Sequence, residues 1–574
     1  MSHRRLLLLA TLALGLLPHL STLHAGLTYD DRDFVQNNAA IQSVGAALGS
    51  FIRPFPPHQP ERGLYRPLTA LSYAVDHQLG GGVAWVFHAT NLLLYGLTLV
   101  VIVVVLRRLD PVSDPVALIV TLLFALHPVH CEVVDSVAGR GELLALLLAL
   151  LALGAFHNAR AHLHSAREGA GRLGWLAASV TLYALAMLSK ETAAVLPAVL
   201  VAHLALWPGA SRREYLMLAP HAVVLAAYLA LRIVALQGHF GPDVVVLQGA
   251  ALSTRLWTMG AVFLEYIRLL VMPGVLQVDV YYEHVVGLQP HLSLHAGLGL
   301  ALLLLTLVAA GIMLHRGHAT RGAVFALLAM LAFLFPVSHI IPFGALMAER
   351  LIYAPSLFFI LLLVLLLRGI VTRAWDRARA WRITLCAVFG LMALLLGLRG
   401  HLRGLEWRDS VTLWTSALQH VQNDPRVYNN LAAGFIERGD LQRAIRMLRL
   451  SLKLRPAHLP ALNNLGYAYM QAGQLDQAER VFLAIVRADP RRHKAWNNLG
   501  VVQLRRGRPN AARRHFLRAL KLNPNHAGAR RNLQQVNGMI DRHNPLRSPP
   551  DGTALPQAGG GPDERSRGKA MHPL

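Results

Sequence analysis

The chain has 574 residues, of which 54% are hydrophobic and only 15% are charged, and its mean hydropathy is +0.41. This composition is too apolar for a soluble globular protein and predicts a polytopic membrane protein for most of the length. The formal net charge is +24, but much of the excess is arginine in short loops between apolar runs, where the positive-inside rule explains it without nucleic acid. The two cysteines, Cys131 and Cys386, cannot form a disulfide framework.

Apolar runs and the arginines between them predict about eleven membrane crossings. The first run, residues 1–21, follows Arg4 and Arg5 and predicts an uncleaved signal-anchor with a cytoplasmic N-terminus. The run at 256–272 is interrupted by Glu265 and Arg268, and a crossing there would invert the arginine pattern, so we expect a re-entrant or interfacial helix. Everything after residue 400 is then non-cytoplasmic. The other crossings are 86–106, 116–126, 143–156, 173–188, 193–207, 215–235, 294–314, 323–337, 351–367 and 383–398.

The C-terminal part repeats with a step of 34 residues. In each unit a glycine ends the first helix, small residues let two helices cross closely, and a proline breaks the chain before the next unit. This pattern is the signature of the tetratricopeptide repeat (TPR). The repeated positions are Leu431, Leu465 and Leu499; Gly439, Gly473 and Gly507; Ala444, Ala478 and Ala512; and Pro456, Pro490 and Pro524.

These patterns predict an all-α chain in three parts. Residues 1–404 form the membrane domain, and residues 405–540 form the TPR solenoid, with full repeats near 426–459, 460–493 and 494–527 and flanking helices. Residues 541–574 are rich in proline, glycine, serine and charge and are predicted to be a disordered tail, because they cannot bury enough apolar surface to fold.

A polar loop from Tyr29 to Asp76, between the first spans, holds the first candidate site residues. Carboxylates and arginines are costly beside a bilayer and usually mark a functional site. Asp30 and Asp31 lie at the predicted outer face, where a carboxylate can take the proton from an acceptor hydroxyl. The alternative is a solvated acidic loop that helps to set the topology.

Cations in predicted outer loops form a second candidate group. Arginine binds phosphate bidentately and lysine binds it as a point charge, and outer cations run against the positive-inside bias. The alternative is pairing with Glu142, Glu191 or Glu349, and Lys190 with Glu191 in particular could form a structural ion pair. The cations are Arg66, Arg140, Lys190 and Arg350.

His127 and His130, with Glu132, form a His-x-x-His pattern beside a carboxylate, which could bind a metal. A third histidine at a diagnostic spacing is missing from the sequence, so a structural loop between two spans is the favoured interpretation. His88 and Asn91, one helical turn apart, are expected to form interhelical hydrogen bonds.

Asp279, which precedes Tyr281 and Tyr282, borders either an acceptor cleft or an interfacial aromatic belt. The chain has no P-loop, no G-x-S-x-G elbow and no H-E-x-x-H motif, which excludes a simple ATPase, an α/β-hydrolase or a zincin.

Several short motifs in this order, followed by TPR units, resemble the transmembrane and TPR repeat-containing (TMTC) protein O-mannosyltransferases, members of the GT-C glycosyltransferase superfamily. The resemblance covers nearly the whole chain to about residue 535, with a short repeat array. The motifs are Tyr29-Asp30-Asp31, Tyr65-Arg66-Pro67-Leu68, Phe87-His88 with Asn91, His127-Pro128-Val129-His130 with Glu132, Gly139-Arg140, Ser189-Lys190-Glu191, and Ala348-Glu349-Arg350-Leu351 with Tyr353 and Pro355.

The resemblance implies a GT-C membrane fold and an inverting transfer of a mannose-like sugar from a polyprenyl-phosphate or dolichyl-phosphate carrier to Ser/Thr hydroxyls. Asp30 and Asp31 would stand at the catalytic carboxylate position, and Arg66 and the Glu349–Arg350 region would surround the lipid phosphate. No metal is expected. The TPR groove would recruit the acceptor polypeptide in the bacterial periplasm or, in a eukaryote, in the lumen of the endoplasmic reticulum.

Two other functions compete with this enzyme. The first is a non-catalytic, membrane-anchored TPR scaffold for envelope protein assembly, but a plain anchor needs one span rather than about eleven. The second is a transporter, which predicts polar residues deep within spans, whereas most spans here are plain Leu, Ala and Val.

Overall fold

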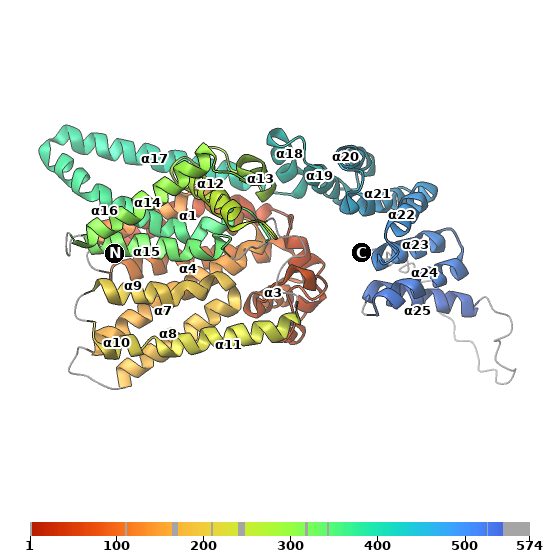
Figure 1. The fold of residues 1–574 in the computed structure, drawn as a ribbon, viewed down its shortest axis with the longest axis horizontal. Coiled ribbons are helices and arrows are strands. Elements are labelled where there is room, and N and C mark those ends of the chain that lie inside the picture. Colours follow the sequence, from red (N-terminus) through yellow and green to blue (C-terminus); the bar gives the residue numbers. More distant parts are fainter. Residues whose placement is uncertain are drawn as a thin grey trace, which may run out of the picture. The chain divides into compact units, whose positions relative to one another are not determined.

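The computed structural model describes residues 3–109, 112–163, 170–207, 210–238, 247–315, 320–340, 344–524 and 526–542. The described chain is helical and contains no strand, which confirms the all-α prediction. It divides into two compact units, Met1–Ala417 and Leu418–Leu574, shown in Figure 1. The tail predicted at 541–574 lies outside the described residues from 543 onward.

The first unit is a bundle of long helices joined by short helices and loops. Its helices are α1 (His3–Leu16), α2 (Val44–Leu48), α3 (Pro67–Gly80), α4 (Ala84–Leu106), α5 (Asp114–Leu126), α6 (Cys131–Val134), α7 (Arg140–Leu163), α8 (Ala170–Ser189), α9 (Leu196–Leu206), α10 (Arg212–Leu216), α11 (Ala219–Leu236), α12 (Leu252–Val271), α13 (Asp279–Val286), α14 (Leu294–His315), α15 (Arg321–Leu334), α16 (Tyr353–Arg377) and α17 (Arg379–Glu406), and α18 (Ser410–His420) follows.

Eight helical segments among the described residues are long and apolar enough to cross a membrane, as expected of a multi-pass membrane protein. The three other predicted crossings coincide with a pair of helices that bend by 56°, Asp114–Leu126 and Pro128–Val134, and with the shorter apolar segments Glu191–Leu206 and Arg321–Val337. The interrupted run at 256–272 forms α12, which is not among the eight.

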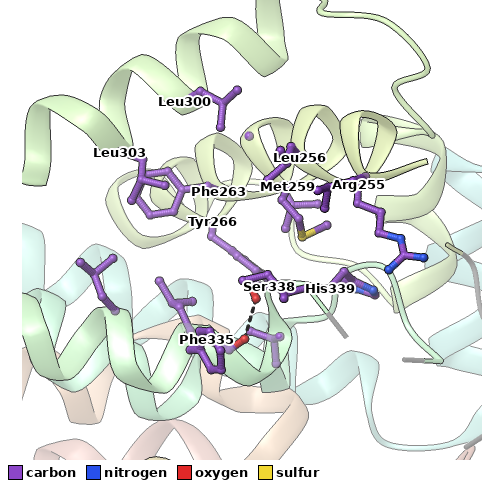
Figure 2. Close-up of a pocket in the computed structure, with 17 residues that line it drawn as sticks. Arg255, Leu256, Met259, Phe263, Tyr266, Leu300, Leu303, Phe335, Ser338 and His339 are labelled. Atoms are coloured by element: carbon purple, nitrogen blue, oxygen red, sulfur yellow. Dashed lines mark hydrogen bonds between the residues drawn. The ribbon is translucent and has the colours of Figure 1, made fainter. Parts of the chain in front are cut away.

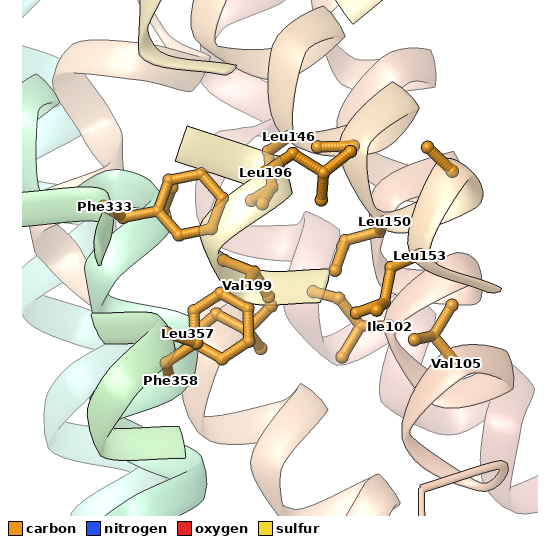
Figure 3. Close-up of a cluster of buried hydrophobic side chains, with 14 of the residues drawn as sticks. Ile102, Val105, Leu146, Leu150, Leu153, Leu196, Val199, Phe333, Leu357 and Phe358 are labelled. Atoms are coloured by element: carbon orange, nitrogen blue, oxygen red, sulfur yellow. The ribbon is translucent and has the colours of Figure 1, made fainter. Parts of the chain in front are cut away.

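The core of the bundle lies where α4, α7, α9, α15 and α16 meet (Figure 3). The short helix α15 lies largely inside the protein there, while α9 buries most of its residues and leaves Val201 exposed. By contrast, only 11% of the apolar window of α14 and 6% of that of α17 is buried. Leucines cover the exposed faces of these two helices, as expected of surfaces in contact with lipid. The core residues drawn include Ile102, Val105, Leu146, Leu150, Leu153, Leu196, Val199, Phe333, Leu357 and Phe358.

Helices α12 and α14 approach each other closely at two glycines. A Cβ atom on Gly299 would lie 1.8 Å from the carbonyl oxygen of Gly260. Small residues of this kind let two helices in a membrane protein pack backbone to backbone. This contact ties α12 to the apolar helix α14, although α12 itself carries Glu265 and Arg268.

The second unit is an array of TPR helix pairs. Gly439, Gly473 and Gly507 have φ angles of +75°, +73° and +70° and end the first helix of each pair, as predicted. The sequence changes from apolar spans to a soluble helical pattern at residue 405. In the structure, residues up to Ala417 belong to the first unit. The helices are α19 (Pro425–Glu437), α20 (Leu441–Leu454), α21 (Leu459–Gln471), α22 (Leu475–Ala488), α23 (His493–Arg505), α24 (Pro509–Leu522) and α25 (Ala527–Arg542).

The two helices of each repeat cross closely, and the pair of residues at the crossing differs between the first and the third repeat. In the third repeat a Cβ atom on Gly500 would lie 2.4 Å from the ring of Phe516, which is completely buried. The first repeat has Ala432 and Leu448 at the equivalent positions, both completely buried. The extra methyl of alanine is therefore matched by a smaller neighbour in that repeat.

We expect Gly500→Ala to destabilise the solenoid, because overpacking costs about 1–3 kcal/mol while the better helix propensity of alanine returns only about 1 kcal/mol. Adding Phe516→Leu reproduces the pair of the first repeat and should recover part of the loss. Urea unfolding of residues 418–542, followed by circular dichroism, measures both variants. A Gly500→Ala variant as stable as the natural solenoid would contradict this account of the crossing.

Candidate functional site

Two groups of charged side chains lie at one end of the helix bundle, the end where α3 and α13 are seen in Figure 1. We call them the Arg350 group and the Arg66 group. The Arg66 group consists of Arg66, Glu142, Lys190 and Glu191, and the Arg350 group of Asp30, Arg62, Glu132, Asp279 and Arg350.

Asp30 is the partly exposed member of the predicted acid pair. Its side chain is 26% exposed and accepts a hydrogen bond of 3.1 Å from Nη1 of Arg62. The same guanidinium donates to Asp33 at 2.5 Å. Asp30 also interacts electrostatically with Asp279 and Arg350. Asp30 is therefore held in place by one arginine and remains open to solvent near a second.

Asp31, in contrast, is completely buried. Its carboxylate accepts hydrogen bonds from the backbone N–H of Thr28 at 2.9 Å, from Oγ of Ser136 at 2.8 Å and from the backbone N–H of Ala138 at 2.7 Å. Burial raises the pKa of Asp31 to about 6, against these hydrogen bonds. Asp31 joins the Tyr29 loop to the loop before α7, and it offers no exposed oxygen to a substrate.

Arg350 lies at the centre of its group. Its guanidinium pairs with Glu132 and lies 3.6 Å from Oδ2 of Asp279, and its backbone N–H donates to Glu132 at 2.8 Å. The side chain is 24% exposed. Burial raises the pKa of Asp279 to about 6, while the charge of Arg350 opposes the shift. The structure thus brings Asp279, predicted at a cleft or in an aromatic belt, into contact with the predicted phosphate cation.

Glu349, the neighbour of Arg350, points into a separate buried network. Its Oε1 accepts hydrogen bonds from the hydroxyl of Tyr282 at 2.9 Å and from Nη2 of Arg403 at 3.2 Å. Arg403 also bonds Glu406 at 2.5 Å. Glu349 and Arg403 are both completely buried. Glu349 therefore supports the chain next to Arg350 and does not face a solvent-filled cleft.

The Arg66 group consists of two ion pairs. Arg66 donates to Glu191 through Nε at 3.1 Å and Nη2 at 2.6 Å, and Lys190 pairs with Glu142. Burial lowers the pKa of Lys190, against the charge of Glu142. The sequence proposed Lys190 with Glu191 as the pair, and the structure gives each of them a different partner for its short contact. The predicted cations are close together, but each is already paired.

Arg140 lies in the protein interior. Its guanidinium forms an ion pair with Asp76, with Nη1 2.6 Å from Oδ2, and donates hydrogen bonds to Oδ1 of Asn91 at 2.9 Å and to the carbonyl oxygen of Phe87 at 2.8 Å. It also lies over the ring of Tyr73, at 4.7 Å from the centroid. The side chain has no exposed surface. A lipid phosphate has no path to it in this arrangement, so we assign Arg140 to the framework of the site.

The predicted histidines make structural contacts. His88 bonds Thr22 at 2.9 Å, and Asn91 donates to the carbonyl oxygen of Ser136. His127 bonds the carbonyl oxygen of Leu270 at 3.1 Å, and His130 bonds Ser356 at 2.8 Å. Because Glu132 pairs with Arg350, the predicted ligands do not converge on one point.

One buried group among the described residues, His19, Cys131 and Asp135, has ligand atoms within 4.8 Å of one another. Its His19 and Asp135 already form a hydrogen bond of 2.8 Å with each other, which accounts for the cluster.

An apolar pocket of about 240 Å³ lies between α12, α14 and the end of α15 (Figure 2). Tyr266, in its wall, interacts electrostatically with Arg350 and Glu132 and packs in one buried cluster with Ala348 and Leu351. Arg255 also lines the pocket. Tyr266 therefore stands between the pocket and the segment that carries Arg350. The pocket lining includes Leu256, Met259 and Phe263 of α12, Leu300 and Leu303 of α14, and Phe335, Ser338 and His339 after α15.

Sequence reasoning missed three residues of this end of the bundle. Arg62 holds Asp30, Asp76 neutralises Arg140, and Arg403 binds Glu349. Asp76 ends the Tyr29–Asp76 stretch that was predicted as a loop, but it lies in α3, so its place in the sequence was visible while its helix and its partner were not. Arg62 and Arg403 lie in stretches with many arginines, and no local pattern distinguishes them.

We expect Arg140→Met to destabilise the membrane unit by about 3–5 kcal/mol, because it leaves the buried carboxylate of Asp76 without its counter-charge. Arg140→Met combined with Asp76→Asn removes both charges and should recover much of the loss. The melting midpoint of the detergent-solubilised protein, followed by fluorescence-detected gel filtration, measures both variants. Equal midpoints for the single and the double variant would argue against a stranded charge.

Both units of the chain are similar to known proteins. A tetratricopeptide repeat model matches residues 463–527. A protein O-mannosyl-transferase of Caenorhabditis elegans is 25% identical over 79% of this chain and 63% of its own length. Human TMTC3, also a protein O-mannosyl-transferase, is 23% identical over 77% of this chain and 50% of its own length. Drosophila melanogaster Tmtc2 is 35% identical over 32% of this chain and 20% of its own length.

The C-terminal unit is a TPR domain, and the curated relatives of the chain are TMTC-family protein O-mannosyltransferases, which confirms the resemblance seen in the motifs. The chain spans between a fifth and just under two thirds of the length of these relatives. Among solved structures, the oligosaccharyltransferase of Archaeoglobus fulgidus in its apo form is 13% identical, with a TM-score of 0.41, over 70% of this chain and 56% of that one.

Proposed function

We propose that the protein is an integral-membrane glycosyltransferase that moves a mannose-like sugar from a polyprenyl-phosphate or dolichyl-phosphate carrier to Ser/Thr hydroxyls of proteins. The observation that carries the proposal is that an accessible carboxylate, Asp30, interacts electrostatically with a partly exposed arginine, Arg350, whose segment packs against Tyr266 in the wall of an apolar pocket. The names of the relatives support the same activity.

In the proposed reaction Asp30 is the general base. Its carboxylate accepts the proton of the acceptor hydroxyl while the hydroxyl oxygen attacks the anomeric carbon of the sugar. The bond from that carbon to the phosphate oxygen breaks, and the configuration at the carbon inverts. The carrier phosphate leaves with one additional negative charge, which Arg350 stabilises. Asp31, saturated with hydrogen bonds, fixes the loop on which Asp30 stands.

The proposed donor fits this end of the bundle because it has a charged part and an apolar part. A polyprenyl phosphate combines one anionic group with a long apolar chain. Arg350 is more exposed than Arg66, at 24% against 11% of its side chain, so we place the phosphate contact at Arg350 first. The pocket on the other side of Tyr266 is an apolar space that could take the start of the prenyl chain.

We propose further that the TPR unit recruits the acceptor polypeptide on the non-cytoplasmic side, in the periplasm of a bacterium or in the lumen of the endoplasmic reticulum. Helix pairs of this kind form concave peptide-binding surfaces. A TPR scaffold without chemistry remains the second candidate. A scaffold does not need a partly exposed carboxylate and a partly exposed arginine in one charged group at the end of a multi-span bundle.

We expect Asp30→Asn to lower sugar transfer by about 10²- to 10⁴-fold, because the amide cannot accept the proton. Asp33→Asn is the matched control: Asp33 shares Arg62 with Asp30 but lies outside the proposed proton transfer, so its rate should stay within a few fold. Transfer of labelled mannose from polyprenyl-phosphate mannose to membrane proteins of expressing cells measures both. If Asp30→Asn transfers sugar at the natural rate, the assignment of Asp30 as the base is refuted. If the natural protein transfers no sugar but still retains its protein partners, the scaffold is favoured.

The proposed reaction uses no metal ion. The residues predicted as ligands, His127, His130 and Glu132, are committed to Leu270, Ser356 and Arg350. We therefore expect washing of the membranes with EDTA to leave transfer within twofold of the untreated rate. A loss that added Mg²⁺ or Mn²⁺ restores would overturn this part of the proposal.

A further inference from the structure

The three stretches that carry Asp30, Asp279 and Arg350 are far apart in sequence, yet one segment contacts all of them. This segment runs from Arg399, near the end of α17, to Ser416 in α18, and we call it the α17–α18 junction. It lies wholly within the first unit. In each of the three stretches the contact falls on residues close before the site residue.

The first stretch is held through its backbone. The N–H of Gly26 donates to the carbonyl oxygen of Arg408 at 3.0 Å, and the hydroxyl of Thr28 donates to the carbonyl oxygen of Trp407 at 3.3 Å. Trp407 is almost completely buried. Two bonds to consecutive residues of the junction therefore fix the chain just before Asp30.

Tyr29 adds a conformational reason for this support. Its φ angle is +54°, a left-handed conformation that is uncommon for a residue with a side chain and persists only where the surroundings impose it. Its ring packs edge-on against Trp414, with the centroids 5.2 Å apart, and Trp414 is 1% exposed. The indole thus stands behind the turn that presents Asp30.

The second stretch leads to Asp279. Nε of Arg399 donates to the carbonyl oxygen of Gly274 at 3.0 Å. The side-chain amide of Gln277 donates to Oγ of Ser416 at 3.3 Å, and Ser416 in turn donates to Glu406 at 3.0 Å. The loop before Asp279 is therefore fixed to the junction at two places.

The third stretch is held by a buried ion pair. Nη2 of Arg403 lies 3.2 Å from Glu349, the residue immediately before Arg350, and Nη1 bonds Glu406 at 2.5 Å. Arg403 has no exposed surface. The carboxylate of Glu406 consequently links the second stretch, through Ser416, to the third, through Arg403.

We infer that the α17–α18 junction is the positioning element of the site: Trp414, Ser416 and Arg403 set the places of Asp30, Asp279 and Arg350 without touching the substrate. A reaction centre is sensitive to such support, since a displacement of about 1 Å can cost about a hundredfold in rate. The inference rests on the proposed function only in its kinetic test, because the positioning itself is a property of the fold.

Hydrogen exchange of the full-length protein, followed by mass spectrometry, tests the positioning directly. We expect Trp414→Leu to speed amide exchange by at least tenfold over residues 26–34, and Trp414→Phe, which keeps a ring against Tyr29, to change it little. Ser416→Ala should loosen residues 274–282 and leave 26–34 protected. Trp381→Leu, a change of the same type at an exposed position of α17, should alter none of the three stretches.

If Ser416→Ala and a folded Trp414 variant leave exchange of these stretches as in the natural protein, the inference is overturned. Should Trp414→Leu fail to fold, Ser416→Ala alone decides, because it removes only one hydroxyl.

The kinetic arm uses the same variants. Trp414→Leu should lower the turnover of sugar transfer by about 10- to 100-fold with the KM for the lipid donor within twofold, and Trp414→Phe should restore most of the turnover. Natural turnover in Trp414→Leu would refute a role in positioning. A natural protein that transfers no sugar would refute the proposed function, while the exchange experiment would still decide the role of the junction.

Discussion

The structure of the membrane unit depends on one electrostatic constraint: a charge removed from water must be paired. Asp31, Arg140, Lys190, Glu349 and Arg403 are all nearly or completely buried at one end of the bundle. Each has a counter-charge or a set of hydrogen bonds, because an isolated buried ion costs several kcal/mol. These contacts join loops to helices that are distant in sequence. These contacts form a framework at the polar end of the bundle, and partly exposed charges such as Asp30, Arg62 and Arg350 stand beside it.

Adjacent residues illustrate how this constraint separates framework from site. Asp30 and Asp31 have the same chemistry and differ in the direction in which the backbone turns them. Asp31 faces inward and receives two backbone N–H groups and a hydroxyl, whereas Asp30 faces Arg62 and solvent. A sequence pattern cannot distinguish them, because both follow Tyr29 in one turn. Tyr29, which precedes both, has a left-handed conformation that the sequence does not reveal.

Most of the fold could be predicted, since its signals are local. The apolar runs gave the spans, and the 34-residue step gave helix pairs with glycine at each expected end. The features that could not be predicted are those that depend on contacts between residues far apart in the sequence. Hydropathy falls at residue 405, but Trp407 and Trp414 are buried against the membrane unit, so the chain divides only after Ala417. Likewise the motifs marked Arg66 and Arg350, while their partners Glu191 and Glu132 lie 125 and 218 residues away.

The dense pairing of charges also bears on the proposed reaction. Groups that are already oriented by a fixed framework would need little reorganisation in the proposed movement of charge from an acceptor hydroxyl to a carrier phosphate. A framework formed by loops alone would be loose. Here the last helix of the bundle supplies Arg399, Arg403 and Glu406, whose bonds reach both the loop before Asp279 and the residue before Arg350. A helix end that carries charges in spite of the cost of burying them therefore holds these two stretches, and the backbone of Trp407 and Arg408 just beyond it holds the stretch before Asp30.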